Sequence, residues 1–248
     1  MNSYEALALS YDELTQDVRY EARADFVEKL FARAKIPVHT VLDLACGTGT
    51  MTGILTGRGY ELIGVDSSEE MLMAAREKAQ ALKGIPPLFL HQSMPELDLY
   101  GTVEACICCL DSLNYLTRAR DVQRTFARLK YFIAPGGVLI FDVHAPQKLE
   151  TLDAQVFLDE RDDVYCVWRT EYRKRARTLD YYVDIFRLCD GGVWERSFEE
   201  HHQRAYTVEE LTQWLKAAGF TEIRTHGDMK LRRPGEGEGR IYFSCIRK

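Results

Sequence analysis

The sequence predicts an α/β protein built on a doubly wound parallel sheet. Apolar, strand-like segments alternate with helical segments between residues 39 and 147, which is typical of a parallel sheet covered by helices. One such segment ends in a small, glycine-spaced turn at residues 45–49, and the next ends in an acid, Asp66. Ligands of these sheets bind at the carboxyl ends of the strands. We therefore expect a ligand site where these two strands end.

The first elements are predicted from periodicity and capping signals. Phe26, Leu30 and Phe31 share a helical stripe within residues 4–34, a segment that also carries three tyrosines, Tyr4, Tyr11 and Tyr20. After Asp66, two serines and two glutamates form an N-cap and an acidic first turn, which predicts a helix to about residue 82. The other elements expected in this half are strands at 39–44, 60–65, 88–91, 105–110 and 138–143, and helices at 50–56 and 120–132.

The pattern changes at about residue 150. Aromatic and β-branched segments at 164–169, 179–188 and 193–198 are typical of strands, with turns at 173–175 and 189–192 between them. We expect an antiparallel β-sheet at residues 150–205, inserted in a ligand-binding domain of residues 1–149 and 206–248. Thr207 caps a further helix that ends at Gly219, and strands follow at 220–224 and 240–246.

Bulk composition limits the functions to be considered. The 248 residues, 46% of them hydrophobic, suffice for one large domain with an insertion. Acids outnumber Lys and Arg by 38 to 32 and the pI is about 5.6, so a nucleic-acid partner is unfavoured though not excluded. The one basic cluster, Arg173, Lys174, Arg175 and Arg177, is either a solvated hairpin turn or a patch for an acidic substrate or RNA.

The N-terminus lacks a secretory pattern, and no apolar run approaches the roughly 18 residues of a membrane helix. Together with an odd count of seven cysteines, these two absences favour a cytoplasmic protein with reduced thiols and no membrane partner. Cys106 and Cys109 form a C-x-x-C with Cys108 between them, inside an apolar strand. No second pair of ligands stands at a matching spacing, so we expect core packing and no metal.

The glycine turn itself indicates a nucleoside ligand. Its glycines let backbone N–H groups approach a ligand, and Asp66 can accept hydrogen bonds from ribose hydroxyls. A dinucleotide fingerprint would place a third glycine three residues after Gly49, whereas Gly53 comes one residue later. A nicotinamide-dependent oxidoreductase is therefore disfavoured, and the remaining alternative is a purely structural turn.

The string Leu-Asp-Leu-Ala-Cys-Gly-Thr-Gly at residues 42–49 resembles the first motif of class I S-adenosylmethionine-dependent methyltransferases. The resemblance covers residues 39–147 and 206–248, and it implies a Rossmann-like, seven-stranded sheet whose last strand is antiparallel. It also implies that S-adenosyl-L-methionine is the cofactor. In that family Asp43 and the backbone from Ala45 to Gly47 hold the methionyl end, and the equivalent of Asp66 holds the ribose.

The resemblance places the adenine beside residues 91–94, where this sequence departs from the family pattern. Ser93 stands where the family usually has an acid; serine can still accept a hydrogen bond, or Gln92 carries the contact instead. Tyr11 and Tyr20 either close over the cofactor or simply pack. The predicted cofactor-binding residues are Tyr11, Tyr20, Asp43, Ala45, Gly47, Gly49, Asp66, Ser67, Met71, Gln92, Ser93, Met94, Leu110 and Asp111.

Methyl transfer from a sulfonium is an in-line displacement, for which placement of the reactants can supply ~7–11 kcal/mol. A base is needed only when the nucleophile arrives protonated, and histidine suits that role. His144, His201 and His202 are candidates, with surface or packing roles as the alternative. Asp111 either contacts the methionine ammonium group or the substrate, or caps the next helix. The predicted catalytic residues are His144, His202 and Asp111.

The whole chain resembles a group of bacterial small-molecule methyltransferases that carry a Tyr-Asp near the start, here Tyr11 and Asp12, and a Leu-Asp-Ser-x-Asn-Tyr, here at residues 110–115. An Asn/Asp-Pro-Pro-Tyr/Phe motif, which would indicate methylation of amide or nucleobase nitrogens, is absent. We therefore expect transfer to a nitrogen or oxygen of a small molecule, with the inserted sheet setting substrate choice. The alternatives are an RNA or protein methyltransferase of the same fold and a cofactor-binding module without transfer.

Overall fold

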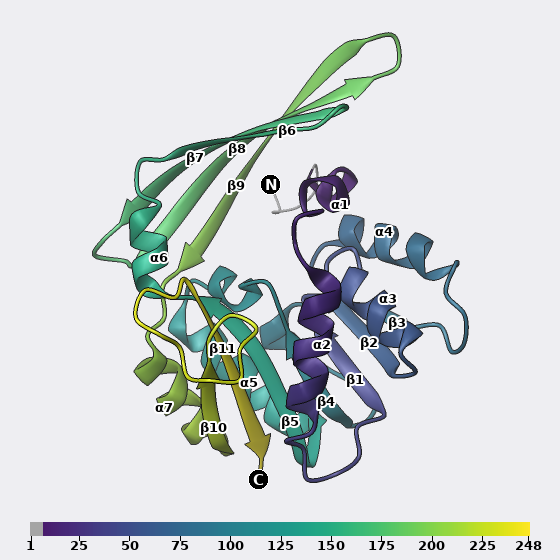
Figure 1. Cartoon of the computed structure of the whole chain (residues 1–248), viewed down its shortest axis with the longest axis vertical. Coiled ribbons are helices and arrows are strands. Elements are labelled where there is room, and N and C mark those ends of the chain that lie inside the picture. The colour runs from purple at the N-terminus through teal and green to yellow at the C-terminus, as the bar shows by residue number, and fades with distance from the viewer. Residues whose placement is uncertain (1–6) are drawn as a thin grey trace.

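Two β-sheets organise the computed structural model, which describes residues 7–248 (Figure 1). Tyr4 lies outside the described residues. The larger sheet has seven strands in the order β10-β11-β5-β4-β1-β2-β3. Its strands are β1 (Thr40–Leu44), β2 (Glu61–Asp66), β3 (Leu88–His91), β4 (Val103–Cys108), β5 (Ile133–His144), β10 (Phe220–His226) and β11 (Arg240–Arg247).

Strand directions confirm the predicted fold class. The first five strands pair in parallel, whereas β11 is antiparallel to both of its neighbours, β5 and β10. Because β1 lies between β2 and β4, the turn after β1 lies next to Asp66 at the end of β2 and to the segment that follows β4. β4 ends at Cys108, two residues before the predicted end, so Leu110 belongs to a turn and not to the strand.

Helices connect these strands and cover the sheet. They are α1 (Tyr11–Leu14), α2 (Tyr20–Phe31), α3 (Thr50–Gly57), α4 (Glu69–Ala79), α5 (Ala119–Phe132), α6 (Pro146–Thr151) and α7 (Val208–Ala218), with 3₁₀ turns η1 (Leu7–Leu9), η2 (Met94–Glu96) and η3 (Ser112–Tyr115). The predicted caps are present: the Ser68 hydroxyl accepts the Met71 N–H at 3.1 Å, and Thr207 forms a capping box with Glu210.

The N-terminal segment is not the single helix expected within residues 4–34. It contains η1 and two helices separated by residues 15–19. The Thr15 hydroxyl donates to the Tyr11 carbonyl at 2.8 Å, which competes with continued helical bonding. α1 is instead held by contacts to the turn after β1, so tertiary structure overrides the helical pattern here.

The core lies on both faces of the larger sheet. Phe126, Phe141 and Phe243 pack on the face covered by α5 and α7, whereas Phe26 and Ile140 pack on the face covered by α2 and α3. Cys106 and Cys108 belong to the first cluster and Cys109 to the second. These buried thiols pack as small apolar side chains, as predicted, and burial raises the pKa of each.

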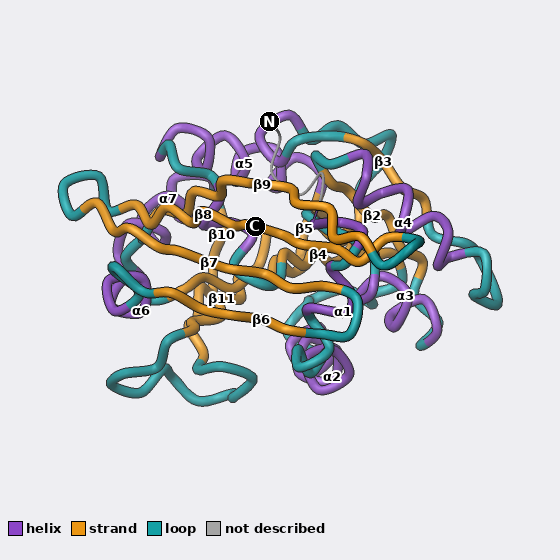
Figure 2. The backbone as a smooth tube through the Cα atoms, turned by 90° about the horizontal axis from the view of Figure 1, so that it is seen from above, coloured by secondary structure: helices purple, strands orange, loops and turns teal. Residues whose placement is uncertain are grey.

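The second sheet is antiparallel and is inserted between β5 and α7, as predicted. Its strands are β6 (Val156–Glu160), β7 (Val164–Arg173), β8 (Thr178–Cys189) and β9 (Val193–Arg204). Seen from above, it passes over the larger sheet on the side where the parallel strands end (Figure 2). Neither α6 nor the edge strand β6 was predicted from the sequence. The run of exposed Val156, Phe157 and Leu158 in β6 lacks the alternation of a half-buried strand.

None of the helices in the described range 7–248 is long and apolar enough to cross a membrane.

Candidate cofactor and active site

The turn after β1, at residues 45–49, leaves part of its backbone accessible to a ligand. Ala45, Gly47 and Gly49 all have positive φ, at 61°, 54° and 73°. A Cβ at Gly47 would meet only the Met71 sulfur, at 4.0 Å, so a ligand can approach the backbone there. Gly49 has a different role, because a Cβ there would lie 3.0 Å from the Cβ of Ala75 and force α3 and α4 apart.

Asp66 fixes this turn and faces the same space. Its Oδ2 accepts the Gly47 N–H at 2.8 Å, and its Oδ1 accepts the Ser68 N–H at 2.9 Å. Burial raises the pKa of Asp66 although these backbone donors oppose the shift. The carboxylate keeps further lone pairs with which to accept hydroxyl protons.

A cavity of about 420 Å³ opens beside Asp66, within the size range of small-molecule sites. It is lined by Tyr11, Ala45, Gly47, Asp66, Ser67, Met71, Ser93, Met94, Pro95, Leu110, Ser112, Tyr115, Leu116, Thr117 and His202. Nine of the predicted cofactor residues and one predicted catalytic histidine therefore share one cavity. His202 belongs to β9, so the inserted sheet contributes a wall of this cavity.

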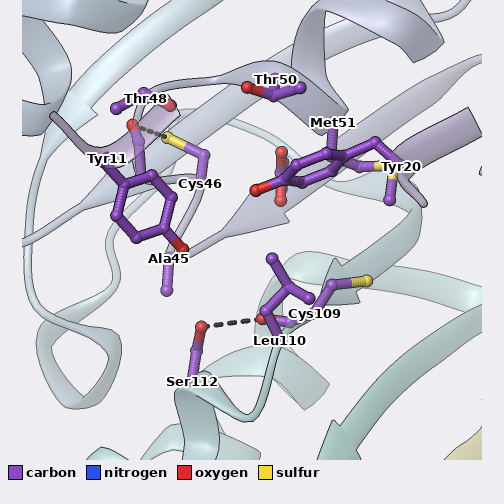
Figure 3. Close-up of a pocket in the computed structure, with 12 residues that line it drawn as sticks. Tyr11, Tyr20, Ala45, Cys46, Thr48, Thr50, Met51, Cys109, Leu110 and Ser112 are labelled. Atoms are coloured by element: carbon purple, nitrogen blue, oxygen red, sulfur yellow. Dashed lines mark hydrogen bonds between the residues drawn. The ribbon is translucent and has the colours of Figure 1, made fainter. Parts of the chain in front are cut away.

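A narrower cavity of about 40 Å³ adjoins it, with Tyr11, Ala45, Gly47, Leu110 and Ser112 lining both (Figure 3). Its other lining residues are Tyr20, Asp43, Cys46, Thr48, Thr50, Met51 and Cys109. Figure 3 shows Tyr11 and Tyr20 on one side and Leu110 and Ser112 on the other.

Asp43 is the carboxylate of the narrow cavity. The Thr52 hydroxyl donates to its Oδ2 at 2.6 Å, and its side chain is otherwise enclosed. Burial raises the pKa of Asp43 to about 6, with the Thr52 bond acting in the opposite direction. A cation in this cavity would favour the ionised carboxylate.

Gln92 is not among the residues that line either cavity. Its Nε2 donates to the Asp98 carbonyl at 3.0 Å and its Oε1 accepts the Asp98 N–H at 2.8 Å. Both ends of the amide are therefore engaged by Asp98 in this structure, and the ligand contact expected of Gln92 stays a prediction. Ser93 does line the larger cavity, and its hydroxyl bonds to Glu96 at 3.1 Å.

Asp111 and His144 lie behind the cavity wall. Asp111 has φ 51° and occupies the N-cap position of η3, but its side chain makes no cap hydrogen bond there. Its Oδ1 lies 3.3 Å from His144 Nε2 and 2.6 Å from Arg240 Nη2. Burial alone would raise the pKa of Asp111, but His144 and Arg240 outweigh it and hold the pKa below its usual range.

The two adjacent histidines of β9 face opposite ways. His201 is buried beside Glu199, with 3.1 Å between Nε2 and Oε2. His202 is half exposed, and its Nδ1 lies 2.7 Å from Asp180 Oδ1. Asp180, almost fully buried on β8, is also paired with Arg173 Nε at 2.7 Å. Asp180 was not predicted as a site residue, because only the pairing of β8 with β9 sets it opposite His202.

The structural role of Asp12 was not predicted from the sequence either. Its Oδ1 accepts the Thr48 hydroxyl at 2.6 Å, and its Oδ2 pairs with Lys78 Nζ at 2.6 Å. This contact holds α1, and with it Tyr11, against the turn after β1. The Tyr11-Asp12 pair was the sequence signal from which this role could have been found.

Comparison with known proteins gives the family. Residues 41–137 match a family model described as a methyltransferase domain. The chain is 34% identical over 245 residues to "Putative methyltransferase YqeM" of Bacillus subtilis (strain 168), covering 98% of this chain and 96% of the relative. A solved S-adenosylmethionine-dependent methyltransferase from Clostridium acetobutylicum ATCC 824 superimposes with a TM-score of 0.86 at 29% identity, covering 99% of both chains.

The chain belongs to the class I S-adenosylmethionine-dependent methyltransferases. A further relative is the dTDP-3-amino-3,4,6-trideoxy-alpha-D-glucopyranose N,N-dimethyltransferase of Streptomyces venezuelae, 28% identical over 74% of this chain and 75% of the relative. The residues present suit the cofactor of this methyltransferase family: open backbone at Gly47, a carboxylate at Asp66 facing the larger cavity, and a carboxylate at Asp43 facing the narrow one.

Proposed function

We propose that this methyltransferase modifies a nitrogen or oxygen of a small molecule that binds between the cofactor and the inserted sheet. The observation that carries the proposal is the shared lining of the larger cavity: Asp66 and Ser93 come from the cofactor side, and His202 comes from β9. A chamber walled on both sides suits a compact acceptor. In this proposal residues 150–205 form the acceptor wall, and residues 1–149 and 206–248 form the cofactor domain.

Charge supports a small acceptor over RNA. The chain carries a net charge of −6, and the basic cluster predicted as a turn lies at the β7–β8 hairpin. Arg173 of that cluster is paired with Asp180, and Arg177 bonds both carboxylate oxygens of Glu210. These pairs reduce the positive charge available to a phosphate backbone. The amino-sugar substrate in the name of the Streptomyces venezuelae relative also supports a small molecule.

The cofactor residues are assigned roles by their positions. Asp66 would accept hydrogen bonds from ribose hydroxyls, and Asp43 would balance the positive charge of the amino acid end. Tyr11 and Tyr20 would exclude water from the narrow cavity, which they line. The bound cofactor supplies a methyl group on a positively charged sulfur, and the chain's own task is then to align the acceptor with it.

His202 is the favoured base. If Nδ1–H donates to Asp180, the neutral ring keeps an acceptor lone pair on Nε2. A hydroxyl acceptor could then lose its proton to Nε2 as the new bond forms, whereas an ammonium acceptor would lose its proton to Nε2 before its nitrogen attacks. His144 does not line the cavity, and its Nε2 is engaged by Asp111, so we assign it a positioning role instead.

Incubation with methyl-labelled S-adenosylmethionine and a fractionated cell extract tests the proposal. We expect label in the small-molecule fraction, and none when Asp66→Ala protein replaces the wild type. Label in RNA or protein would overturn the small-molecule acceptor. Tight binding of S-adenosylhomocysteine without label in any fraction would instead support a binding module without transfer.

A further inference from the structure

Two successive residues of the cavity wall hold a backbone conformation that non-glycine residues seldom adopt. Leu110 has φ 60° and Asp111 has φ 51°. In this left-handed region the Cβ crowds the neighbouring carbonyl, so the conformation persists only where the surroundings enforce it. Leu110 lines both cavities. We call these two residues the 110–111 turn. The contacts that hold this turn therefore shape the wall that the two cavities share.

A single carboxylate holds the backbone of the 110–111 turn. The Leu110 N–H donates to Asp142 Oδ1 at 2.8 Å, and the Asp111 N–H donates to Asp142 Oδ2 at 3.0 Å. Asp142 is fully buried in β5, where an unpaired charge would be costly. Arg240 supplies the opposite charge, bonding to Asp142 and, through Nη2, to Asp111 Oδ1 at 2.6 Å. Backbone and side chain of the turn are thus fixed together.

The inserted sheet reaches the same turn. Gln203 of β9 donates from Nε2 to Asp111 Oδ2 at 2.6 Å, and its Oε1 accepts the Tyr181 hydroxyl at 3.2 Å. Gln203 is almost fully buried. Successive residues of a strand point to opposite faces, so Gln203 contacts the 110–111 turn while its neighbour His202 lines the larger cavity.

We propose that Asp142, Arg240 and Gln203 are positioning residues that hold the 110–111 turn against the cofactor, with Gln203 linking that turn to the inserted sheet. None of the three is among the lining residues of the two cavities, so each acts through Leu110 and Asp111. The proposal depends on the methyltransferase family and not on the identity of the acceptor. It can therefore be tested with cofactor analogues alone.

The positioning role of Gln203 is tested by calorimetry on a Gln203→Met variant, which gives the Kd of S-adenosylhomocysteine and that of adenosine. The substitution keeps the side chain's length but removes the hydrogen bond to Asp111. We expect the Kd of S-adenosylhomocysteine to rise about tenfold and that of adenosine to change less than about twofold. The ligands should differ because Cys109, Leu110 and Ser112 line the narrow cavity assigned to the amino acid end, whereas Asp66 lines only the larger one.

Glu195→Gln on the exposed part of β9 is the matched control and should leave both affinities unchanged. Asp142→Asn should give a larger selective loss, because its amide nitrogen cannot accept the second backbone N–H. If that variant fails to fold, Tyr181→Phe takes its place, with a smaller loss of the same selectivity. Equal weakening of both ligands by Gln203→Met would indicate a merely structural role and overturn the proposal, as would unchanged affinity for S-adenosylhomocysteine.

Discussion

The two sheets bury different kinds of side chain. The interior of the seven-stranded sheet is built mainly from apolar residues on both faces, and its ligand-facing groups lie where the parallel strands end. The inserted sheet buries polar groups along its strands, among them Asp180, Asp184, Glu199, His201 and Gln203. His201 is paired with Glu199 of the same strand, and the others are paired across the sheet or with another part of the chain, as Asp184 is with Arg169 and Arg196.

This difference assigns cofactor binding to the larger sheet and choice of the acceptor to the inserted sheet. At the ends of parallel strands, backbone N–H groups and one or two carboxylates suffice for a common nucleoside cofactor. In the inserted sheet, pairs such as His202 with Asp180 depend on strand register, so a change at this pair alters only the acceptor side. The contrast predicts that damage to the larger sheet abolishes cofactor binding, whereas damage to the His202–Asp180 pair slows transfer and leaves cofactor binding intact. Gln203, which bonds to Asp111 of the 110–111 turn, is the exception on the inserted sheet.

Asp66→Ala should give the largest effect. The substitution removes the proposed ribose acceptor and also the partner of the Gly47 N–H. Because each hydrogen bond to a charged group contributes about 1.5–3 kcal/mol, affinity for S-adenosylhomocysteine should fall about 100-fold or more. Isothermal titration calorimetry measures the change, with Glu77→Ala on the exposed side of α4 as the control. Unchanged affinity would refute the ribose role.

His202→Gln should instead slow transfer about 100-fold while the Kd of S-adenosylhomocysteine stays within about twofold. Asp180→Asn should produce part of that loss, since it weakens the orientation of the ring but leaves Nε2 in place. Initial rates of label transfer into the small-molecule fraction give the first quantity and calorimetry the second. A loss of cofactor affinity in either variant would contradict the separation between the two sheets.

Sequence patterns could predict the larger sheet because its function depends on local signals. A glycine turn needs positive φ at Gly47 and Gly49, and an acid at a strand end needs only to follow an apolar run. Asp66, the residue replaced in the first prediction, was identified from this sequence pattern. Likewise, capping at Ser68 and Thr207 involves residues three apart in the chain and was predicted correctly.

The missed features depend on contacts between distant residues. Asp142 reaches the 110–111 turn across 32 positions, and Asp12 reaches Thr48 across 36. No periodicity marks such pairs. His144 looked equivalent to His202 in the sequence, since both follow apolar or strand-like segments, and only the strand arrangement shows that His202 lines the cavity and His144 does not.

The pH dependence of cofactor affinity should depend on Asp43. In the free protein burial raises its pKa to about 6, and a cationic ligand end would bind the ionised form. Affinity for S-adenosylhomocysteine should therefore be constant above pH ~6.5 and fall by up to about tenfold for each pH unit below ~6. Asp43→Asn should bind more weakly at pH 7.5 and lose this dependence. An identical pH profile for wild type and variant would exclude Asp43 as the titrating group.

The smallest effect is expected at the contact that holds Tyr11 over both cavities. Asp12→Asn keeps an oxygen for the Thr48 hydroxyl but loses the charge that pairs with Lys78. That pair is about half exposed, so its removal should cost little stability. Looser attachment of α1 should raise the dissociation rate of S-adenosylhomocysteine about threefold. Stopped-flow measurement of tyrosine and tryptophan fluorescence gives the rate, with Glu69→Gln, which removes an exposed pair with Arg76, as the control.

If Asp12→Asn leaves dissociation unchanged while Tyr11→Ala accelerates it, the ring covers the cofactor without help from Asp12. If neither does, α1 plays no part in retaining the cofactor.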